Sequence, residues 1–340
     1  MGATVDQTPD VAAGAGPVGE AGVTLLVSII NYRTAQMTLE AVRSVLADRG
    51  DLDLHVAVVD NRSDDGSAEA IEAWIAAQDP PVPVSLVRSS TNSGFSGGHN
   101  QGVAARPAEF YLILNSDALL VPGCLAQLVA AARADPRAAL VSPRIEHPDG
   151  RAQNVCFRSP TPASELVRAA GTGVVARLLD RYRIHLGDAP EPEEILWVTF
   201  AGVLVRAAAF AEIGPMDEGY FLYYEDVDYG RRVRAAGWGF RFVPGARLVH
   251  IRGGSAPVKA LALARKRLPP YFYAARSRYF YKAFGRGGLL AANLLWYLGR
   301  GVARARRLAG RRTPPAIEAE WRDIWTNFTD PLGDRRAPEE

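Results

Sequence analysis

Cysteine is nearly absent from this sequence. Of 340 residues only Cys124 and Cys156 are cysteines, and they lie far apart in the chain. A disulfide-stapled fold needs more cysteines than two, and the common zinc sites need closely spaced pairs. Both classes are therefore excluded. We expect the two thiols to be buried as small apolar groups in a protein of a reducing compartment.

Long hydrophobic runs are missing as well. Residues 1–22 have no basic start followed by an apolar block, and their small, polar, glycine- and alanine-rich composition predicts a disordered tail instead of a signal peptide. The apolar block 288–298 is too short to span a bilayer unaided. Its aromatic and arginine borders suit a helix that lies in a membrane interface across 287–299, and a plain core helix is the alternative.

Acidic residues are absent from a long C-terminal stretch. No Asp or Glu occurs in 229–317, which contains twenty Lys and Arg, although the whole chain has a net charge of only +2. Such a stretch favours polyanions such as phosphates or anionic lipid headgroups, and a solvated surface without a partner is the alternative. We expect no nucleic acid as partner, because no nucleic-acid-reading motif accompanies the charge. The sequence indicates no oligomeric state.

The first 140 residues alternate short apolar runs with helical patterns. The runs 23–30, 54–59, 84–87 and 111–114 predict buried strands, and apolar residues recur at helical spacing between them. This alternation predicts an α/β fold with a mainly parallel, Rossmann-like sheet and flanking helices. Residues 197–205 predict one further strand with Gly202 inside it. From about residue 260 the pattern becomes helical and basic.

Polar residues follow the predicted strands at the points where they end. Asn31, Asp60, Asn92 and Asp117 each stand after one of the four apolar runs. Ligands of open α/β sheets bind at the carboxyl ends of the strands, so these four residues should line one crevice. The glycine-rich turn 92–102 can bring backbone N–H groups to a phosphate, but it matches neither the dinucleotide fingerprint nor a P-loop.

Three acids cluster at Glu225, Asp226 and Asp228, just after an aromatic run. Aromatic surroundings can raise a carboxyl pKa into the range that suits a general base, although acids are also common in the first turn of a helix. Asp117 could hold a divalent cation or cap the next helix. His250, at the end of a strand-like run, could ligate a metal or bind a backbone carbonyl.

These pieces, in this order, resemble family 2 glycosyltransferases with the GT-A fold, and within them the bacterial rhamnosyltransferase-like branch. The matching stretches are SIINYRT (28–34), VVDNRSDDGS (58–67), NSGFSGGHNQG (92–102), LILNSDALL (112–120), the block from FAGVLV to RAAGW (200–238) that contains EDVDYGRR, and VHIRGGS (249–255). The resemblance implies a glycosyltransferase domain over 23–258, followed by a basic helical C-terminal extension over 259–330.

The resemblance also implies roles for individual residues. Asp226 matches the carboxylate that acts as general base on the acceptor hydroxyl, with Glu225 in support. Asp117 and His250 match ligands of a divalent metal, Mg²⁺ or Mn²⁺. Gly202 and Arg232 fall on the acceptor side. The residues expected at the donor nucleotide-sugar are Asn31, Tyr32, Asp60, Asn92, Gly94, Asn100, Asn115 and Asp117.

One departure concerns Asn115, which stands where the family's metal motif usually has its first acid. We therefore expect metal binding either to be weaker or to depend more on His250 and on the diphosphate itself.

The implied activity is an inverting transfer, with rhamnose from dTDP-rhamnose as the best match, to a saccharide or a polyprenyl-diphosphate-linked saccharide in cell-surface polysaccharide synthesis. Another hexosyl or galactofuranosyl transferase using a UDP- or GDP-sugar is an alternative, as is a non-catalytic sugar-nucleotide-binding protein. We expect a cytoplasmic protein, peripheral on the inner face of the cytoplasmic membrane. Arg276, Arg278 and Lys282 would lie near the acceptor phosphates.

Overall fold

The computed structural model describes residues 22–187, 190–251, 258–313 and 315–338. Most of the tail predicted for 1–22 and the Gly253–Ser255 part of the last matching stretch lie outside these residues. The centre of the molecule is an eight-stranded sheet in the order β3-β2-β1-β4-β9-β6-β10-β5. Its strands are β1 (Val23–Asn31), β2 (Leu54–Asp60), β3 (Val84–Arg88), β4 (Ala108–Leu114), β5 (Ala118–Leu120), β6 (Ala138–Glu146), β9 (Gly202–Arg206) and β10 (Gly239–His250).

The four strands at one side of the sheet run parallel, β2 pairing with β3 and β1 pairing with both β2 and β4. The apolar runs of β1, β2 and β4 are largely buried on both faces, which is why they read as continuous hydrophobic stretches, while β3 at the sheet edge is mostly half-buried. Only β9 and β5 run antiparallel to their neighbours. The prediction of a mainly parallel α/β sheet is therefore confirmed.

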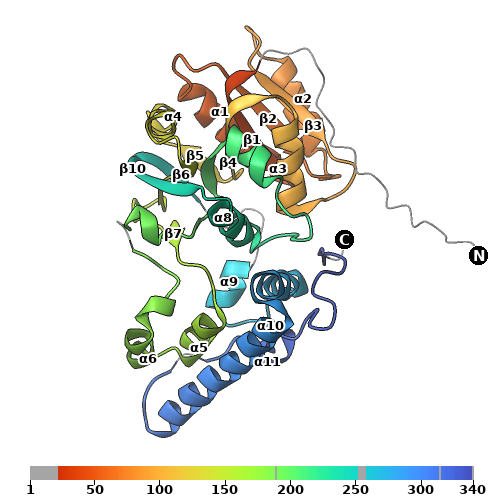
Figure 1. Cartoon of the computed structure of the whole chain (residues 1–340). Helices are drawn as coiled ribbons and strands as arrows, with labels where there is room; N and C mark the ends of the chain where they lie inside the picture. The colour runs from red at the N-terminus through yellow and green to blue at the C-terminus, as the bar shows by residue number, and fades with distance from the viewer. Residues whose placement is uncertain (1–21, 188–189, 252–257, 314, 339–340) are drawn as a thin grey trace, which may run out of the picture.

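Helices connect and cover these strands (Figure 1). Those of the sheet region are α1 (Ala35–Ala47), α2 (Ser67–Ala76), α3 (Gly94–Ala104), α4 (Cys124–Ala134), α7 (Ala207–Ile213) and α8 (Glu225–Ala235). Cys124 and Cys156 are both buried, and neither forms a disulfide. Buried side chains of β1, β2, β4, β6 and β9 form one continuous apolar core with those of the helices.

The strand predicted for 197–205 is wrong. The structure divides this run into β8 (Trp197–Val198), which pairs with β7 (Cys156–Phe157) in a separate small sheet, and β9 of the central sheet. The residues between them, Thr199 to Ala201, carry the chain from one sheet to the other. All nine residues are apolar or small, so hydrophobicity alone could not locate the break.

A second, helical layer lies below the sheet in Figure 1, with α8 between the two. It contains α5 (Pro162–Ala170), α6 (Gly173–Leu178), α9 (Val258–Leu263), α10 (Pro270–Leu308) and α11 (Glu320–Asp323). α10 packs extensively on α5, so this layer draws on residues from both sides of the predicted boundary at 258. Gly285, with φ of 68°, breaks α10 into two helical halves. No helix in the described part of the chain is long and apolar enough to cross a membrane.

Candidate active site

The ends of β1 and β2 hold a buried carboxylate in a fixed position. Asn31 and Asp60 are register partners in the sheet, and the Asn31 amide donates a 2.7 Å hydrogen bond to Asp60. The hydroxyl and the backbone N–H of Ser63 donate to the same carboxylate. Asn31 is completely buried, so it orients Asp60, while the neighbouring Tyr32 remains partly exposed at the strand end. The sequence interpretation missed Ser63, although it lies within a quoted stretch.

A second amide organises the glycine-rich turn. Asn61 donates from its side chain to Asn92 at 2.9 Å and to the carbonyl of Gly94 at 3.0 Å, and its side-chain oxygen accepts from the N–H of Ser93. Asn61 is buried and directly follows β2, a position that could have marked it in the sequence. The start of α3 is therefore fixed to the end of β2.

Gly94 brings α3 against the loop that leads into α8. Its φ is +70°, and a side-chain Cβ at this position would lie 2.2 Å from the carbonyl oxygen of Phe221. That carbonyl accepts a 2.8 Å hydrogen bond from the N–H of Phe95. Only glycine permits both the left-handed conformation and the close approach. The donor-side turn and the segment before the acid pair are thus in direct contact.

Asn100 fastens α3 to the same loop. Its amide donates to the carbonyl of Met216 at 2.9 Å and to Glu218 at 3.0 Å, and its oxygen accepts from the N–H of Met216. All of these partners belong to the protein. A contact of Asn100 with the donor remains a prediction.

Asp117 and His250 meet at the ends of β4 and β10. His250 Nε2 lies 3.1 Å from an Asp117 carboxylate oxygen and 3.3 Å from the Asn115 amide nitrogen. Two backbone contacts hold them, since Ile251 N–H donates to the Asp117 carbonyl and the Gln153 side chain donates to the His250 carbonyl. Within the described ranges no cluster combines three or more His, Cys, Asp or Glu side chains in a metal-binding arrangement. The pair therefore offers one carboxylate and one imidazole.

Glu225 and Asp226 open α8 as its first two residues. Glu225 is buried, and burial together with the charge of Asp226 raises the pKa of its carboxyl well above the usual range. Burial also raises the pKa of Asp226, to about 7, although hydrogen bonds from the backbone of Val227 and Phe200 oppose the shift. A carboxyl that titrates near neutral pH is suited to accept a proton from a substrate hydroxyl.

The backbone just before the acid pair is strained. Tyr223 and Tyr224 adopt φ values of 75° and 67°, in the left-handed region that residues with side chains rarely occupy. Each such residue costs about 1–3 kcal/mol and persists only where packing enforces it. Phe272 of α10 packs against both tyrosine rings, and Tyr279 packs against Tyr224. The helical layer therefore holds the turn that aims Glu225 and Asp226.

Phe200 and Ala201 join the two sides of the site. The backbone of Phe200 lies close enough to the Asp226 carboxylate to lower its pKa, and the carbonyl of the next residue, Ala201, accepts from the N–H of Asn115 at 3.1 Å. The acid pair and the Asn115–Asp117 segment are far apart in sequence, but they flank this one dipeptide. A donor held at Asp117 and an acceptor hydroxyl held at Asp226 would be neighbours.

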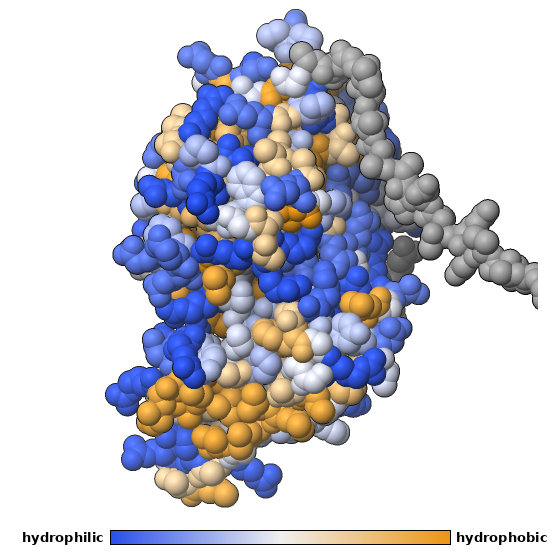
Figure 2. Space-filling model, in the orientation of Figure 1, coloured by the Kyte–Doolittle hydropathy of each residue, from blue (hydrophilic) through white to orange (hydrophobic). Residues whose placement is uncertain are grey.

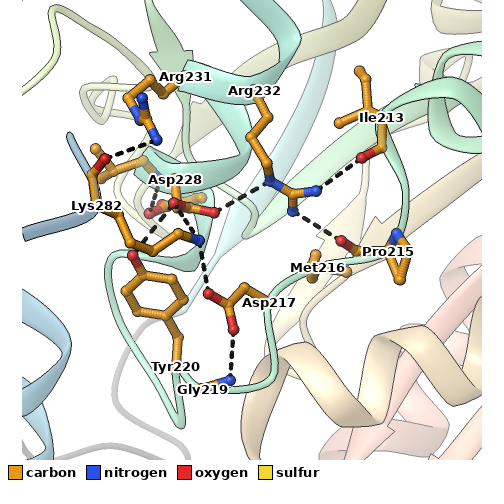
Figure 3. A network of polar contacts seen from close by, with 12 residues as sticks. Ile213, Pro215, Met216, Asp217, Gly219, Tyr220, Asp228, Arg231, Arg232 and Lys282 are labelled. Carbon is orange, nitrogen blue, oxygen red and sulfur yellow. Dashed lines mark hydrogen bonds and ion pairs between the residues drawn. The ribbon is translucent and has the colours of Figure 1, made fainter. Parts of the chain in front are cut away.

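Asp228, the third acid of the cluster, belongs to a buried ion-pair network (Figure 3). It lies 2.8 Å from Lys282 Nζ of α10 and accepts from Arg232 of its own helix at 3.2 Å. Lys282 also pairs with Asp217 at 2.7 Å, and Arg278 pairs with the same carboxylate at 3.0 Å. Although burial opposes it, these hydrogen bonds hold the pKa of Asp217 well below its usual range. The network fastens α8 to α10.

Arg232 also donates to the carbonyls of Ile213 and Pro215, as Figure 3 shows. Its guanidinium thus fastens the α7–α8 connection to α8. A role of Arg232 in binding the acceptor substrate remains a prediction. Gly202 lies at the start of β9, where a Cβ would be 2.3 Å from the Leu248 side chain. The close neighbour of this glycine is therefore a core side chain.

The expectation that Arg276 lies near the acceptor phosphates is wrong, and for Arg278 and Lys282 it remains a prediction. Arg276 is only 1% exposed and pairs with Glu165 at 2.9 Å. Arg278 and Lys282 both form ion pairs with Asp217, as described above. The cations of an acid-free stretch are unpaired only if no acid from another part of the chain packs against them. Here Glu165 and Asp217 form ion pairs with them.

Comparisons with known proteins show the family to which the chain belongs. Residues 26–171 match the family model "Glycosyl transferase family 2". The chain is 30% identical over 267 residues to the N-acetylglucosaminyl-diphospho-decaprenol L-rhamnosyltransferase of Mycobacterium tuberculosis, an alignment that covers 73% of this chain and 80% of that protein. The chain belongs to glycosyltransferase family 2.

This glycosyltransferase is also 25% identical over 175 residues to the low-salt glycan biosynthesis hexosyltransferase Agl10 of Haloferax volcanii, covering 50% of this chain and 52% of Agl10. Among solved structures it resembles the mannosyltransferase PcManGT of Pyrobaculum calidifontis in complex with GDP-Man and Mn²⁺, with a TM-score of 0.50 and 17% identity over 94% of this chain and 87% of that one. GalNAc-T7 with UDP, GalNAc and Mn²⁺ gives a TM-score of 0.54 and 16% identity over 91% of this chain and 59% of that one. Its fold is GT-A.

Proposed function

We propose that this enzyme transfers a sugar, with inversion, from a nucleoside-diphosphate donor to a saccharide carried on a polyprenyl diphosphate, and that the sugar is rhamnose from dTDP-rhamnose. The observation that carries the proposal is the placement of Asp226, with its raised pKa, across the Phe200–Ala201 dipeptide from Asn115 and Asp117. The name of the mycobacterial relative supports the choice of sugar and of a lipid-linked acceptor.

In this proposal Asp226 takes the proton of the acceptor hydroxyl. The acceptor oxygen then forms a bond to the anomeric carbon on the face opposite the diphosphate, and the bond from that carbon to the diphosphate oxygen breaks. Glu225, whose carboxyl pKa is raised well above its usual range by burial and by the charge of Asp226, stands beside the base. Asp60, held by Asn31 and Ser63, would face the nucleoside.

A divalent cation fits the donor end of the site. Asp117 and His250 supply an oxygen and a nitrogen ligand, since His250 Nε2 lies 3.1 Å from an Asp117 carboxylate oxygen. Asn115 adds an amide next to them. Because the protein supplies only one carboxylate here, the diphosphate would complete the coordination. When bound, such a cation neutralises the charge of the leaving diphosphate.

A donor screen tests this proposal. We expect dTDP-rhamnose with Mg²⁺ or Mn²⁺ to raise the melting temperature more than UDP- or GDP-sugars do, because a ligand that binds the folded state stabilises it. A larger shift with a UDP- or GDP-sugar would instead support another hexosyl or galactofuranosyl transferase. Binding of a donor without any transfer, tested with a water-soluble N-acetylglucosaminyl-diphospho-lipid analogue, would contradict the proposed acceptor.

An acceptor of this kind is anchored in a bilayer. The enzyme would therefore work as a peripheral protein at the cytoplasmic face of the membrane, where nucleotide-sugars are available to it.

A further inference from the structure

The second half of α10, residues 286–308, carries apolar side chains on two opposite faces. One face, which includes Trp296 and Gly299, is buried; a Cβ on Gly299 would lie 2.6 Å from the carbonyl oxygen of Leu166 in α5. On the other face Leu294 and Leu298 are 55% and 56% exposed. A surface helix usually turns polar side chains to solvent, so packing within the described part of the chain does not explain these exposed leucines.

The exposed apolar side chains recur at helical spacing and form one stripe. Leu290, Leu294 and Leu298 are four residues apart, and Tyr297 lies among them. Trp321 of α11, 61% exposed, continues the stripe, since its carbonyl accepts a hydrogen bond from the Tyr297 hydroxyl. We call these five residues the α10 face. Figure 2 shows an apolar band across the lower part of the molecule, where Figure 1 draws this half of α10.

The surroundings of the α10 face are cationic. Arg286, Arg304 and Arg307 are exposed on the same helix, and Arg311 and Arg312 follow it. Most acids on the neighbouring elements already form ion pairs with arginines. Glu165 and Glu320 pair with Arg168, and Asp323 pairs with Arg267. Glu318, just before α11, is an exposed acid.

We propose that the α10 face docks on an anionic lipid bilayer, with the helix axis parallel to the membrane plane. Leucines flanked by Tyr, Trp and arginines are the composition of helices that lie at the headgroup boundary. The segment 286–308 is about 33 Å long as a helix. Its apolar stripe runs along one side only, so the helix would lie flat on the membrane surface. A second copy of the chain is a poorer occupant, because a symmetric contact would bring the arginines of both chains together.

Docking in this way would also place the active site. The first half of α10 holds α8 through Lys282 and packs on the turn before the acid pair, and the break at Gly285 separates it from the docking half. The catalytic helix would thus sit at a fixed height above the lipid. This inference rests on the proposed lipid-linked acceptor for its purpose, but membrane binding itself can be measured without any substrate.

Co-sedimentation of the full chain with vesicles tests the proposal. We expect binding to vesicles of equal phosphatidylglycerol and phosphatidylcholine, at least tenfold weaker binding to pure phosphatidylcholine, and weakening when salt is raised from 0.1 to 0.5 M.

The triple variant Leu290→Gln, Leu294→Gln, Leu298→Gln should bind at least tenfold more weakly, and so should Arg304→Gln with Arg307→Gln. The matched controls Leu332→Gln and Arg151→Gln alter exposed side chains elsewhere and should bind like the unchanged protein.

Nucleotide-sugar binding, measured by thermal stabilisation, should be unchanged in every variant, which shows that each one is folded. Absence of binding to the anionic vesicles at 0.1 M salt would overturn the proposal, as would a triple variant that sediments normally. A triple variant that turns a dimer into a monomer in light scattering, with vesicle binding intact, would assign the face to a second copy. Vesicle binding without transfer activity would leave the docking face in place and contradict only the proposed function.

Discussion

The two charged pairs of the active site are built in opposite ways. On the proposed donor side Asp117 has the imidazole of His250 3.1 Å away, so the pair offers a cation one oxygen and one nitrogen ligand. On the proposed acceptor side Glu225 and Asp226 stand next to each other at the start of a helix. Burial disfavours the ionised form of both carboxyls and so raises their pKa. The first arrangement suits a site that binds a cation. The second suits a carboxyl that changes its protonation state.

Replacing the base should have the largest effect. Asp226→Asn removes the proton acceptor and keeps the shape of the side chain, so we expect the transfer rate to fall by about 10³-fold, the middle of the range for a general base. Donor binding, followed by thermal stabilisation, should be unchanged. Glu225→Gln serves as the matched control, with a loss of less than tenfold. A larger loss for Glu225→Gln than for Asp226→Asn would reverse the two roles.

Replacing the donor-side carboxylate should have the next largest effect and a different character. Asp117→Asn removes an anionic ligand of the proposed cation, so kcat/KM should fall by about 100-fold and the metal concentration needed for half-maximal rate should rise. Asn115→Asp adds a carboxylate beside His250 and should lower that concentration. If neither variant changed the metal requirement, the cation would have to bind elsewhere.

The pH dependence should separate the two pairs as well. Because the pKa of Asp226 is raised to about 7, the base is mostly protonated in mildly acidic solution. We expect kcat/KM to fall about tenfold for each pH unit below 7. Binding of the donor should change much less over the same range. A rate that is constant between pH 5 and 7 would exclude Asp226 as the titrating base.

The smallest effect should appear in stability. A carboxyl whose pKa is higher in the folded state than its ordinary 3.8 favours folding while it is protonated, and this contribution is lost as the pH rises from about 4 to about 7. Asp226→Asn should therefore increase the free energy of unfolding at pH 8 by about 1–2 kcal/mol, and by less than half as much at pH 5. Denaturant unfolding of both proteins at the two pH values measures the difference. Equal gains at both pH values would mean that the charge is not the cause.

The strands of the proposed donor side could be predicted well from the sequence, and the physical reason is local. Each buried parallel strand is a short apolar run, and the polar residue after it marks the edge where ligands bind. The runs that begin at Val23, Leu54 and Val84 predicted their strands to within one residue. The supporting amide Asn61 was missed because nothing in the sequence tells an orienting side chain from a ligand-binding one.

The acceptor side could not be predicted so well, because its geometry depends on contacts between distant segments. The strained turn at Tyr223 and Tyr224 exists only because Phe272 and Tyr279 pack on it. Lys282 looked like a free cation in an acid-free stretch, but Asp217 and Asp228 lie against it in the fold. Charge counts along a chain do not show which charges meet after folding.

The contact between Gly94 and the carbonyl of Phe221 limits how this enzyme can be divided. A fragment that stops before Phe221 would keep every strand of the nucleotide side and all of the stretch 26–171 that matches the family model, yet it would lose the acceptor of the Phe95 N–H bond that anchors the start of α3. The nucleotide-binding half is therefore not a self-contained module that could be transplanted onto another acceptor domain. An engineered chimera would have to carry the 220–224 loop together with the donor half.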